Sequence, residues 1–172
     1  NDDNDDNDDN DDNSDLLNYW LLCYRYKLKN NILILIILRI MCGIFAYISS
    51  TNIYSKTMEF RKKILMEFSK TQHRGPDNSV FRNISPTTIF GFHRLAIVDT
   101  SAAGDQPFVM DGIYLICNGE IYNHKTLINS NNFKTTSDSD CEVILHLYKK
   151  YGIEKTVNSL DGVFAFVLYD SN

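Results

Sequence analysis

The chain has 172 residues, of which 44% are hydrophobic, and its formal net charge is −5. Nine of its 22 acidic residues lie in residues 1–15, whereas residues 42–172 carry 13 acidic and 13 basic groups. A domain with balanced charge gives no electrostatic reason to expect nucleic acid or an anionic membrane surface as its partner. Residues 42–172 are numerous enough to form one domain with a core of its own.

The cysteines and histidines show no spacing typical of a metal site, so no metal is expected. The four cysteines lie far apart and form no C-x-x-C pair: Cys23, Cys42, Cys117 and Cys141. This spacing is also unlike the disulfide framework of a small secreted protein. Reduced thiols are the usual state in the cytosol, and we therefore expect a cytoplasmic protein.

The first 41 residues differ in composition from the rest of the chain. Residues 1–15 repeat Asn-Asp-Asp and contain no apolar residue, which predicts a disordered tail. Residues 16–41 are apolar and basic, but their charged residues interrupt the length that a membrane-spanning helix needs. Three interpretations of residues 16–41 stay open: translated sequence upstream of the true start, a removable pro-segment, or a membrane anchor. The first is favoured, because Met41 is the first methionine of the chain.

Cys42 follows Met41 and is the candidate nucleophile. If Met41 is the initiator, an aminopeptidase is expected to remove it, because cysteine is small. Cys42 would then carry a thiol and a free α-amino group on one residue. An α-amino group has a pKa of roughly 7.7–8.0 and can accept a proton near neutral pH. A thiol beside such a base is a recognised form of activated nucleophile.

The periodicity of apolar residues predicts mixed strands and helices in the first half of this domain. The helix is expected to be amphipathic, with Met58, Ile64, Leu65 and Phe68 on one side. In chain order we expect a buried strand at Cys42–Ile48, this helix at Tyr54–Lys70 and a loop at 73–77. Three short strands are expected to follow, at Ser79–Ile84, Thr87–Phe92 and Leu95–Val98.

The second half opens with the strongest hairpin signal of the chain. Asp111-Gly112 separates two apolar runs, and this dipeptide is typical of a tight hairpin turn. Asn118-Gly119-Glu120 is expected to end the second strand of that hairpin. The predicted elements around it are strands at Phe108–Met110 and Ile113–Cys117, and then a short helix at Ile121–Ile128.

The last predicted elements are two helices and a buried strand. Ser139 and Glu142 have the spacing of a capping box, which predicts a helix from there to about Tyr151 with Gly152 as its stop. A brief helix at Ile153–Leu160 and a strand at Val163–Tyr169 follow. Strands with helices between them predict an α+β fold. The chain stops directly after a strand, and we expect the domain to be incomplete at its C-terminal end.

A series of short motifs occurs in one order along residues 42–172. Their order and spacing resemble the glutaminase domain of glutamine-hydrolysing asparagine synthetases. Any one motif is weak, but together they are specific. They are Cys42-Gly43-Ile44-Phe45, HRGPD at 73–77, GFHRLAIVD at 91–99, Gln106-Pro107, NGEIYNH at 118–124, SDCEVILHLY at 139–148 and LDGVFAFVLYD at 160–170.

The resemblance implies a fold and an activity. The fold is a four-layer αββα sandwich of the N-terminal-nucleophile hydrolase type, in a class II glutamine amidotransferase domain at residues 42–172. The activity is hydrolysis of L-glutamine to glutamate and ammonia through a cysteine thioester, with no cofactor in this domain. A C-terminal synthetase domain in the same protein would use the ammonia, with ATP and Mg, to make asparagine from aspartate. The resemblance leaves a homodimer open as the oligomeric state.

The resemblance also assigns roles to single residues. Cys42 attacks the substrate amide while its own amine carries the proton. The Asn118 side chain and the Gly119 backbone N–H form the oxyanion hole. The glutamine-binding residues are Arg94 for the α-carboxylate, Leu95, Ala96, Ile97 and Val98 through backbone groups, Asp140 for the ammonium, and Glu120 near that ammonium. Arg74 and Asp77 are expected to order their loop and not to touch the substrate.

Two alternatives stay open. The chain could be another class II amidotransferase, which would differ in the acceptor of the ammonia, although HRGPD and NGEIYNH favour asparagine synthetase. The second alternative is a catalytically silent binding module, tethered to a membrane, in which residues 1–41 stay attached. The Cys42 nitrogen is then a peptide amide and cannot act as a base.

Overall fold

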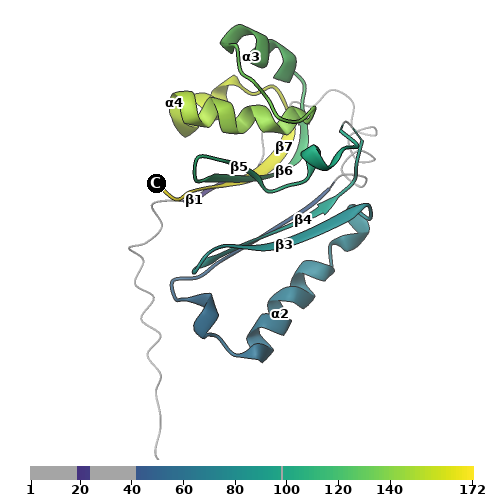
Figure 1. Cartoon of the computed structure of the whole chain (residues 1–172), viewed down its shortest axis with the longest axis vertical. Coiled ribbons are helices and arrows are strands. Elements are labelled where there is room, and N and C mark those ends of the chain that lie inside the picture. The colour runs from purple at the N-terminus through teal and green to yellow at the C-terminus, as the bar shows by residue number, and fades with distance from the viewer. Residues whose placement is uncertain (1–18, 24–41, 98) are drawn as a thin grey trace, which may run out of the picture.

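The computed structural model describes residues 19–23, 42–97 and 99–172. These residues form two antiparallel sheets, with helices on their outer sides (Figure 1). One sheet has the strand order β2-β4-β3, and the other has the order β1-β7-β6-β5. The strands are β1 Tyr19–Cys23, β2 Gly43–Ile48, β3 Asn78–Ser85, β4 Thr88–Arg94, β5 Phe108–Met110, β6 Ile113–Ile121 and β7 Gly162–Asp170.

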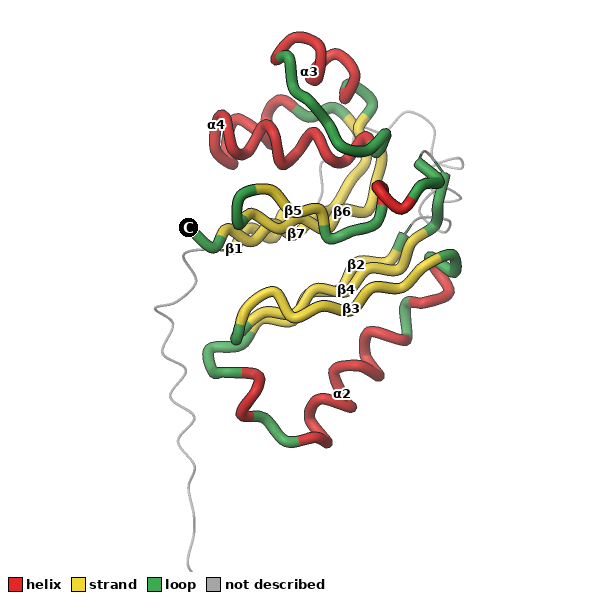
Figure 2. Tube along the Cα trace, in the orientation of Figure 1, coloured by secondary structure: helices red, strands yellow, loops and turns green. Residues whose placement is uncertain are grey.

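The three α-helices of the described residues lie on the outer sides of the two sheets. Figure 2 shows α2 below the β2-β4-β3 sheet and α3 and α4 above the other sheet, so that the sheets face each other. The helices are α2 Met58–Ser69, α3 His124–Asn131 and α4 Val143–Ser159. The expected α+β class is therefore confirmed.

The space between the sheets is filled by apolar side chains from both of them. Phe90 and Phe92 of β4 pack in one buried cluster with Ile116 of β6 and Val167 of β7. Phe90 and Ile116 are fully buried. Alternation along each strand directs every second side chain to this layer. The cluster therefore holds the two sheets, and whatever lies at their common edge, at a defined distance.

Each sheet also has an outer core beneath its helix. Ile144, Leu145 and Leu147 of α4 are buried in the largest apolar cluster, with Leu115 and Phe166 among the strand residues of its sheet. Under the other sheet, the core is smaller and its buried members are Ile53, Ile64 and Ile89.

Helix α2 begins later than the sequence predicts. A short 3-10 turn occupies Ile53–Ser55, and the helix starts after Thr57, whose Oγ1 accepts a hydrogen bond from the Phe60 N–H at 3.2 Å. Ile64 and Phe68 are buried as expected. The prediction that Met58 and Leu65 lie on the buried side is wrong, since Met58 is 68% exposed and Leu65 is 51% exposed.

The hairpin prediction at Asp111-Gly112 is confirmed. Both residues have positive φ, 47° and 79°, as a two-residue primed turn requires. Strand β6 is longer than expected, however, and continues through Asn118–Glu120 to Ile121 in register with β7. The predicted helix over Ile121–Ile128 begins at His124 instead.

Two local predictions are wrong because the groups that were expected to form the element make hydrogen bonds to other partners. Leu95–Ile97 is not a strand, because the Leu95 and Ala96 N–H groups donate to the Cys42 Sγ and to Asp77 Oδ2 and not to a neighbouring strand. The capping box is not formed either, since Ser139 makes no side-chain cap. Glu142 instead accepts hydrogen bonds from the backbone and hydroxyl groups of residues 136–137.

The two predicted helices near the C-terminus are confirmed as two helical segments of α4 that meet at Gly152. That glycine has φ 75° and interrupts the helical conformation. The final strand is confirmed as β7, whose far edge is paired with β1 at Tyr19–Cys23, a strand that the sequence did not indicate. The expected disordered tail at 1–15, most of segment 16–41, and Val98 lie outside the described residues. Within the described part of the chain, no helix combines the length and the apolar character needed to cross a bilayer.

We expect Phe90→Ala to lower the free energy of unfolding by about 3–5 kcal/mol, because it opens a cavity between the sheets that neighbouring side chains cannot fill. Urea titration followed by circular dichroism measures this change. The matched control is Val109→Ala on β5, where the residue is 49% exposed and the loss is expected to stay below about 1 kcal/mol. Equal losses for the two variants would contradict the two-sheet core.

Candidate active site

Cys42 lies directly before strand β2, with its sulfur against the backbone that follows strand β4. The Leu95 N–H donates to Cys42 Sγ at 3.2 Å, and the thiol lies 3.5 Å from the Leu95 carbonyl oxygen. The residue is half-buried. Burial raises the pKa of the Cys42 thiol, and the hydrogen bond from Leu95 opposes that rise. The sulfur is thus held in place by the backbone N–H and carbonyl oxygen of one residue, Leu95.

The HRGPD loop makes hydrogen bonds with the backbone of Cys42 and of Ala96. Arg74 Nε donates to the Cys42 carbonyl oxygen at 3.4 Å, and Asp77 Oδ2 accepts from the Ala96 N–H at 2.8 Å. Gly75 lies so close to β4 that a Cβ atom there would stand 2.2 Å from the His93 oxygen. Arg74 and Asp77 therefore order the backbone, as the sequence analysis expected.

The facing strand β6 brings Asn118 and Gly119 to the same end of the molecule. Gly119 has φ 153°, and a Cβ atom there would lie 2.3 Å from the Val163 carbonyl oxygen of β7. Only glycine fits this position without a shift of the strands. Asn118 Oδ1 is buried and has no hydrogen-bond partner among the described residues. A buried polar atom without a partner is unusual, and it is a feature that binding sites share.

Gln106 fixes the strand just before Asn118. Its side-chain amide pairs with the backbone of Cys117 in both directions, with the Cys117 N–H donating at 2.6 Å and the Cys117 oxygen accepting at 3.1 Å. Gln106 is buried, at 5% exposure. The side chain acts as one more strand residue beside β6. It therefore limits the movement of the backbone that carries Asn118.

Asp140 lies in a short 3-10 helix, Asp140–Glu142, at the start of α4. Its Oδ2 accepts a hydrogen bond from the Ile121 N–H at 2.5 Å, and the residue is 5% exposed. The adjacent Cys141 thiol points to the Gly119 oxygen at 3.9 Å. These contacts hold the Asp140 carboxylate against the end of β6, next to Asn118 and Gly119.

Arg94 ends strand β4, and its guanidinium is largely engaged within the protein. Nη1 donates to the Ser101 oxygen at 2.7 Å and to Asp105 Oδ1 at 2.6 Å, and Nη2 donates to the Asp99 oxygen. A guanidinium has five N–H donors. Within the described part of the chain, three of them are used by these bonds, which leaves the Nε donor and one on Nη2.

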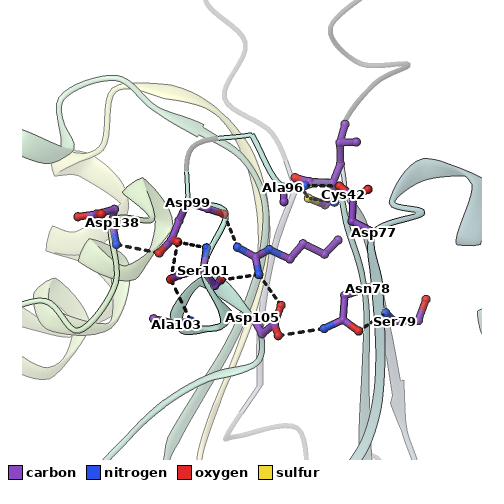
Figure 3. Close-up of polar contacts among 12 residues, drawn as sticks. Cys42, Asp77, Asn78, Ser79, Ala96, Asp99, Ser101, Ala103, Asp105 and Asp138 are labelled. Atoms are coloured by element: carbon purple, nitrogen blue, oxygen red, sulfur yellow. Dashed lines mark hydrogen bonds and ion pairs between the residues drawn. The ribbon is translucent and has the colours of Figure 1, made fainter.

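The loop that Arg94 holds is cross-linked by carboxylates (Figure 3). Asp105 bridges Arg94 and Asn78, whose Nδ2 donates to Asp105 Oδ2 at 2.9 Å. Asp99 accepts from both the N–H and the hydroxyl of Ser101 at 2.7 Å, and from the Asp138 N–H at 3.0 Å. The Ser101 bonds are the main reason that the pKa of Asp99 is lowered. Both carboxylates are therefore bound on each of their oxygens.

Glu142 anchors the segment that leads to Asp140. The carboxylate accepts four hydrogen bonds from the N–H and hydroxyl groups of Thr136 and Ser137 at 2.6–3.0 Å. Burial alone would raise the pKa of Glu142, but the hydrogen bonds from His146, Ser137 and Thr136 lower it to about 2. Glu142 is therefore ionised at neutral pH, and it fixes the entry of the chain into α4.

The structure brings most of the candidate residues together and leaves a few apart. Cys42, Leu95 and Arg94 meet at the end of the β2-β4-β3 sheet, and strands β2 and β6 are in contact across the molecule. Ile97 is 68% exposed and Glu120 is also exposed. The supporting residues of the site were not predicted as such, although Asp99, Gln106 and Glu142 lie within the motifs. They are Asp99, Ser101, Asp105, Gln106 and Glu142.

Comparison with known proteins finds one matching family and several similar proteins. Residues 41–172 match the family described as "Glutamine amidotransferase domain". The chain is 45% identical to asparagine synthetase [glutamine-hydrolyzing] of Rattus norvegicus over 136 residues, 76% of this chain and 23% of that protein. The proteins of the same description from Homo sapiens and Gallus gallus are 44% and 43% identical over the same shares. The chain thus spans about a quarter of the length of these relatives.

The lowered pKa of Glu142 predicts a pH dependence of stability. Because the carboxylate has an ordinary pKa of 4.5 and a folded-state pKa of about 2, its contribution is complete above pH 4.5 and is lost as the pH falls towards 2. Glu142→Gln should lower the free energy of unfolding at pH 7 by about 1–3 kcal/mol and flatten its decline between those pH values. Urea titrations from pH 2 to pH 7 measure both effects. The control is the exposed Glu154→Gln, and a decline as steep in Glu142→Gln as in wild type would contradict the assignment.

Proposed function

This chain belongs to the family of glutamine amidotransferase domains, and we propose on that premise that it releases ammonia from L-glutamine through a thioester on Cys42. The observation that carries the proposal is the position of Cys42 Sγ, which lies at the start of β2 and accepts a hydrogen bond from the Leu95 N–H at 3.2 Å. The names of its relatives, which describe them as glutamine-hydrolysing, support the same reaction.

The nucleophile needs a base because burial raises the pKa of the Cys42 thiol. We propose that the α-amino group of Cys42 is that base once the residues before it have been removed. The amine takes the thiol proton as sulfur bonds to the amide carbon of glutamine. It then gives the proton to the leaving nitrogen, so that ammonia departs and the thioester forms. Water attacks the thioester, and glutamate leaves with the proton returned to sulfur.

The negative oxygen of the tetrahedral intermediate needs fixed donors. The proposed donors are the Asn118 side chain and the Gly119 N–H, on a strand whose backbone Gln106 holds in place. Preorganised neutral donors of this kind contribute about 10²–10³ each to the rate of an acyl transfer. The Asn118 Nδ2 would donate to the oxyanion, whereas the buried Oδ1, which has no partner among the described residues, is an acceptor and would receive a hydrogen bond from a donor of the bound molecule.

Glutamine also presents a carboxylate and an ammonium on its α-carbon. We propose that Asp140 binds the ammonium through the carboxylate oxygen that does not accept from Ile121, with Glu120 nearby. Arg94 would bind the carboxylate with the donors left on Nε and Nη2, which lie on one edge of the guanidinium and suit two parallel hydrogen bonds. Backbone groups of Leu95–Val98 complete the pocket.

The proposal extends to the fold type and to the protein as a whole. We propose that the two facing sheets and their outer helices are the αββα sandwich of the N-terminal-nucleophile hydrolases. The ammonia would pass to a synthetase domain in the same protein, where ATP and Mg serve the conversion of aspartate to asparagine in the cytoplasm. The glutaminase step itself requires no cofactor.

A second candidate is favoured by one feature of the structure. Strand β1 at Tyr19–Cys23, which precedes Cys42, pairs with Leu168, Val167 and other residues of β7. In a protein that keeps this segment, the Cys42 nitrogen stays a peptide amide. Such a protein would bind glutamine without hydrolysing it.

We expect glutamate release only from protein whose first residue is Cys42. The test compares a form that begins at Cys42 with the 172-residue chain, each joined to the remainder of the protein, after intact mass has established both N-termini. The first should hydrolyse glutamine, and the second should show no turnover because its nitrogen cannot accept a proton.

Cys42→Ala in the active form should abolish turnover while the unfolding temperature stays close to wild type, because a half-buried thiol contributes little to packing. Equal turnover from the two forms, or activity that survives Cys42→Ala, would overturn the proposal. If the protein isolated from its own cells keeps the residues before Cys42 and binds glutamine without turnover, the silent module is favoured instead.

A further inference from the structure

Asp99 makes hydrogen bonds both with Arg94 and with the segment that leads to Asp140. Its backbone oxygen accepts from Arg94 Nη2, and its side-chain Oδ2 accepts from the Asp138 N–H at 3.0 Å. Arg94 ends a strand of one sheet, whereas Asp138 lies two residues before Asp140 beside the other sheet. Asp99 and Asp138 are 39 positions apart in the sequence.

The Asp99 side chain is rigid because each of its oxygens is bound. Oδ1 accepts from the Ser101 N–H and from the Ser101 hydroxyl, each at 2.7 Å, and Oδ2 accepts from Asp138. Asp99 is 9% exposed. A carboxylate with this many donors stays ionised, and the Ser101 bonds lower its pKa accordingly. The Asp99 carboxylate is therefore negatively charged and held in one orientation by Ser101 and Asp138.

We propose that Asp99 is a positioning residue that sets the distance between Arg94 and Asp140, and so makes the site selective for ligands that carry both an α-carboxylate and an α-ammonium. This rests on the function proposed above. The two charged groups of an α-amino acid share one carbon, so their separation is fixed. Arg94, which ends a strand of one sheet, and Asp140, which lies in a 3-10 helix beside the other sheet, can engage both charges only if their own separation matches it closely.

Asp105 braces the same loop but cannot replace Asp99. It joins Arg94 to Asn78, and both of these residues belong to the β2-β4-β3 sheet. Asp105 therefore fixes Arg94 relative to its own sheet alone. The hydrogen bond from the Asp138 N–H to Asp99 links the loop after β4 to the segment that leads to Asp140.

Asp99→Asn is the sharpest change, since it keeps the shape of the side chain. An asparagine has one acceptor oxygen and one NH₂ donor, so one of the N–H donors of Ser101 or Asp138 would face another donor. If the NH₂ faces Asp138, the link to the Asp140 segment is lost. If it faces Ser101, the turn at 99–101 that holds Arg94 is disturbed.

The experiment measures binding of two ligands by calorimetry. L-Glutamine carries the ammonium, whereas 4-carbamoylbutanoate is the same molecule without it. Every variant is made in the full-length protein with Cys42→Ala, so that bound glutamine is not hydrolysed. We expect the parent protein to prefer L-glutamine by about tenfold or more, the size expected of a charge-assisted hydrogen bond. Asp99→Asn should weaken L-glutamine binding by about tenfold and 4-carbamoylbutanoate binding by less than about threefold.

A second test variant and a control variant accompany Asp99→Asn. Ser101→Ala removes one donor to Asp99 at an exposed position, and should shift the ligand preference in the same direction by a smaller factor even if Asp99→Asn fails to fold. Asp170→Asn is the matched control. Asp170 is also an aspartate with a lowered pKa and hydrogen-bonded oxygens, but it lies at the opposite end of β7 from Gly162 and should leave both affinities unchanged.

The possible results separate this inference from the proposed function. If the parent protein binds neither ligand, or binds both equally, the proposed glutamine site is wrong and the role of Asp99 falls with it. If the parent protein prefers L-glutamine and Asp99→Asn keeps the same preference, only the role of Asp99 is wrong. Equal weakening of both ligands by Asp99→Asn would mean a collapsed pocket and would likewise overturn the positioning role.

Discussion

The site depends on one contact, the hydrogen bond from the Leu95 N–H to Cys42 Sγ. It exists because the chain leaves the sheet after Arg94, so that the next two N–H groups turn to side chains and not to a neighbouring strand. A thiol at the start of β2 is thereby held beside the strand end that carries Arg94. The HRGPD loop keeps this backbone in place, with Asp77 bound to Ala96.

The remaining groups of the site reach Cys42 only through packing over a long range in sequence. Phe90 and Phe92 on one sheet meet Ile116 and Val167 on the other, and this apolar layer sets the distance between the two strand ends. Polar contacts then adjust the fine geometry, through Gln106, which pairs with Cys117 of β6, and through Asp99 in the loop after β4. Apolar burial therefore stabilises the fold, whereas hydrogen-bonded buried carboxylates fix the positions of the site residues.

Much of the fold could be predicted from the sequence, because the strongest signals were local. The Asp111-Gly112 turn needs positive φ at both positions, and Gly152 interrupts a helical pattern, so both were visible in the residues themselves. Strand β1 was not predictable, since its pairing with β7 joins segments more than 140 residues apart. Leu95–Ile97 has the apolar composition of a strand, but its hydrogen bonds go to side chains that sequence spacing does not reveal.

The candidate site was predictable to a similar degree. Motif resemblance pointed to Cys42, Arg94, Asn118 and Asp140. In the structure Cys42 directly precedes β2, Arg94 ends β4, Asn118 lies in β6, and Asp140 lies in the 3-10 helix before α4. The supporting residues were missed because an aspartate such as Asp99 looks like any polar loop residue until its partners are known. A buried carboxylate with donors on both oxygens is a three-dimensional property.

The central claim is that Cys42, as the first residue of the mature protein, forms a covalent bond with glutamine. The most direct measurement mixes that protein with L-glutamine, quenches the reaction in acid within one turnover, and maps the adduct by peptide mass spectrometry. The account predicts a γ-glutamyl thioester on a peptide whose first residue is Cys42. An adduct on a different residue, or on a peptide in which Met41 still precedes Cys42, would contradict it.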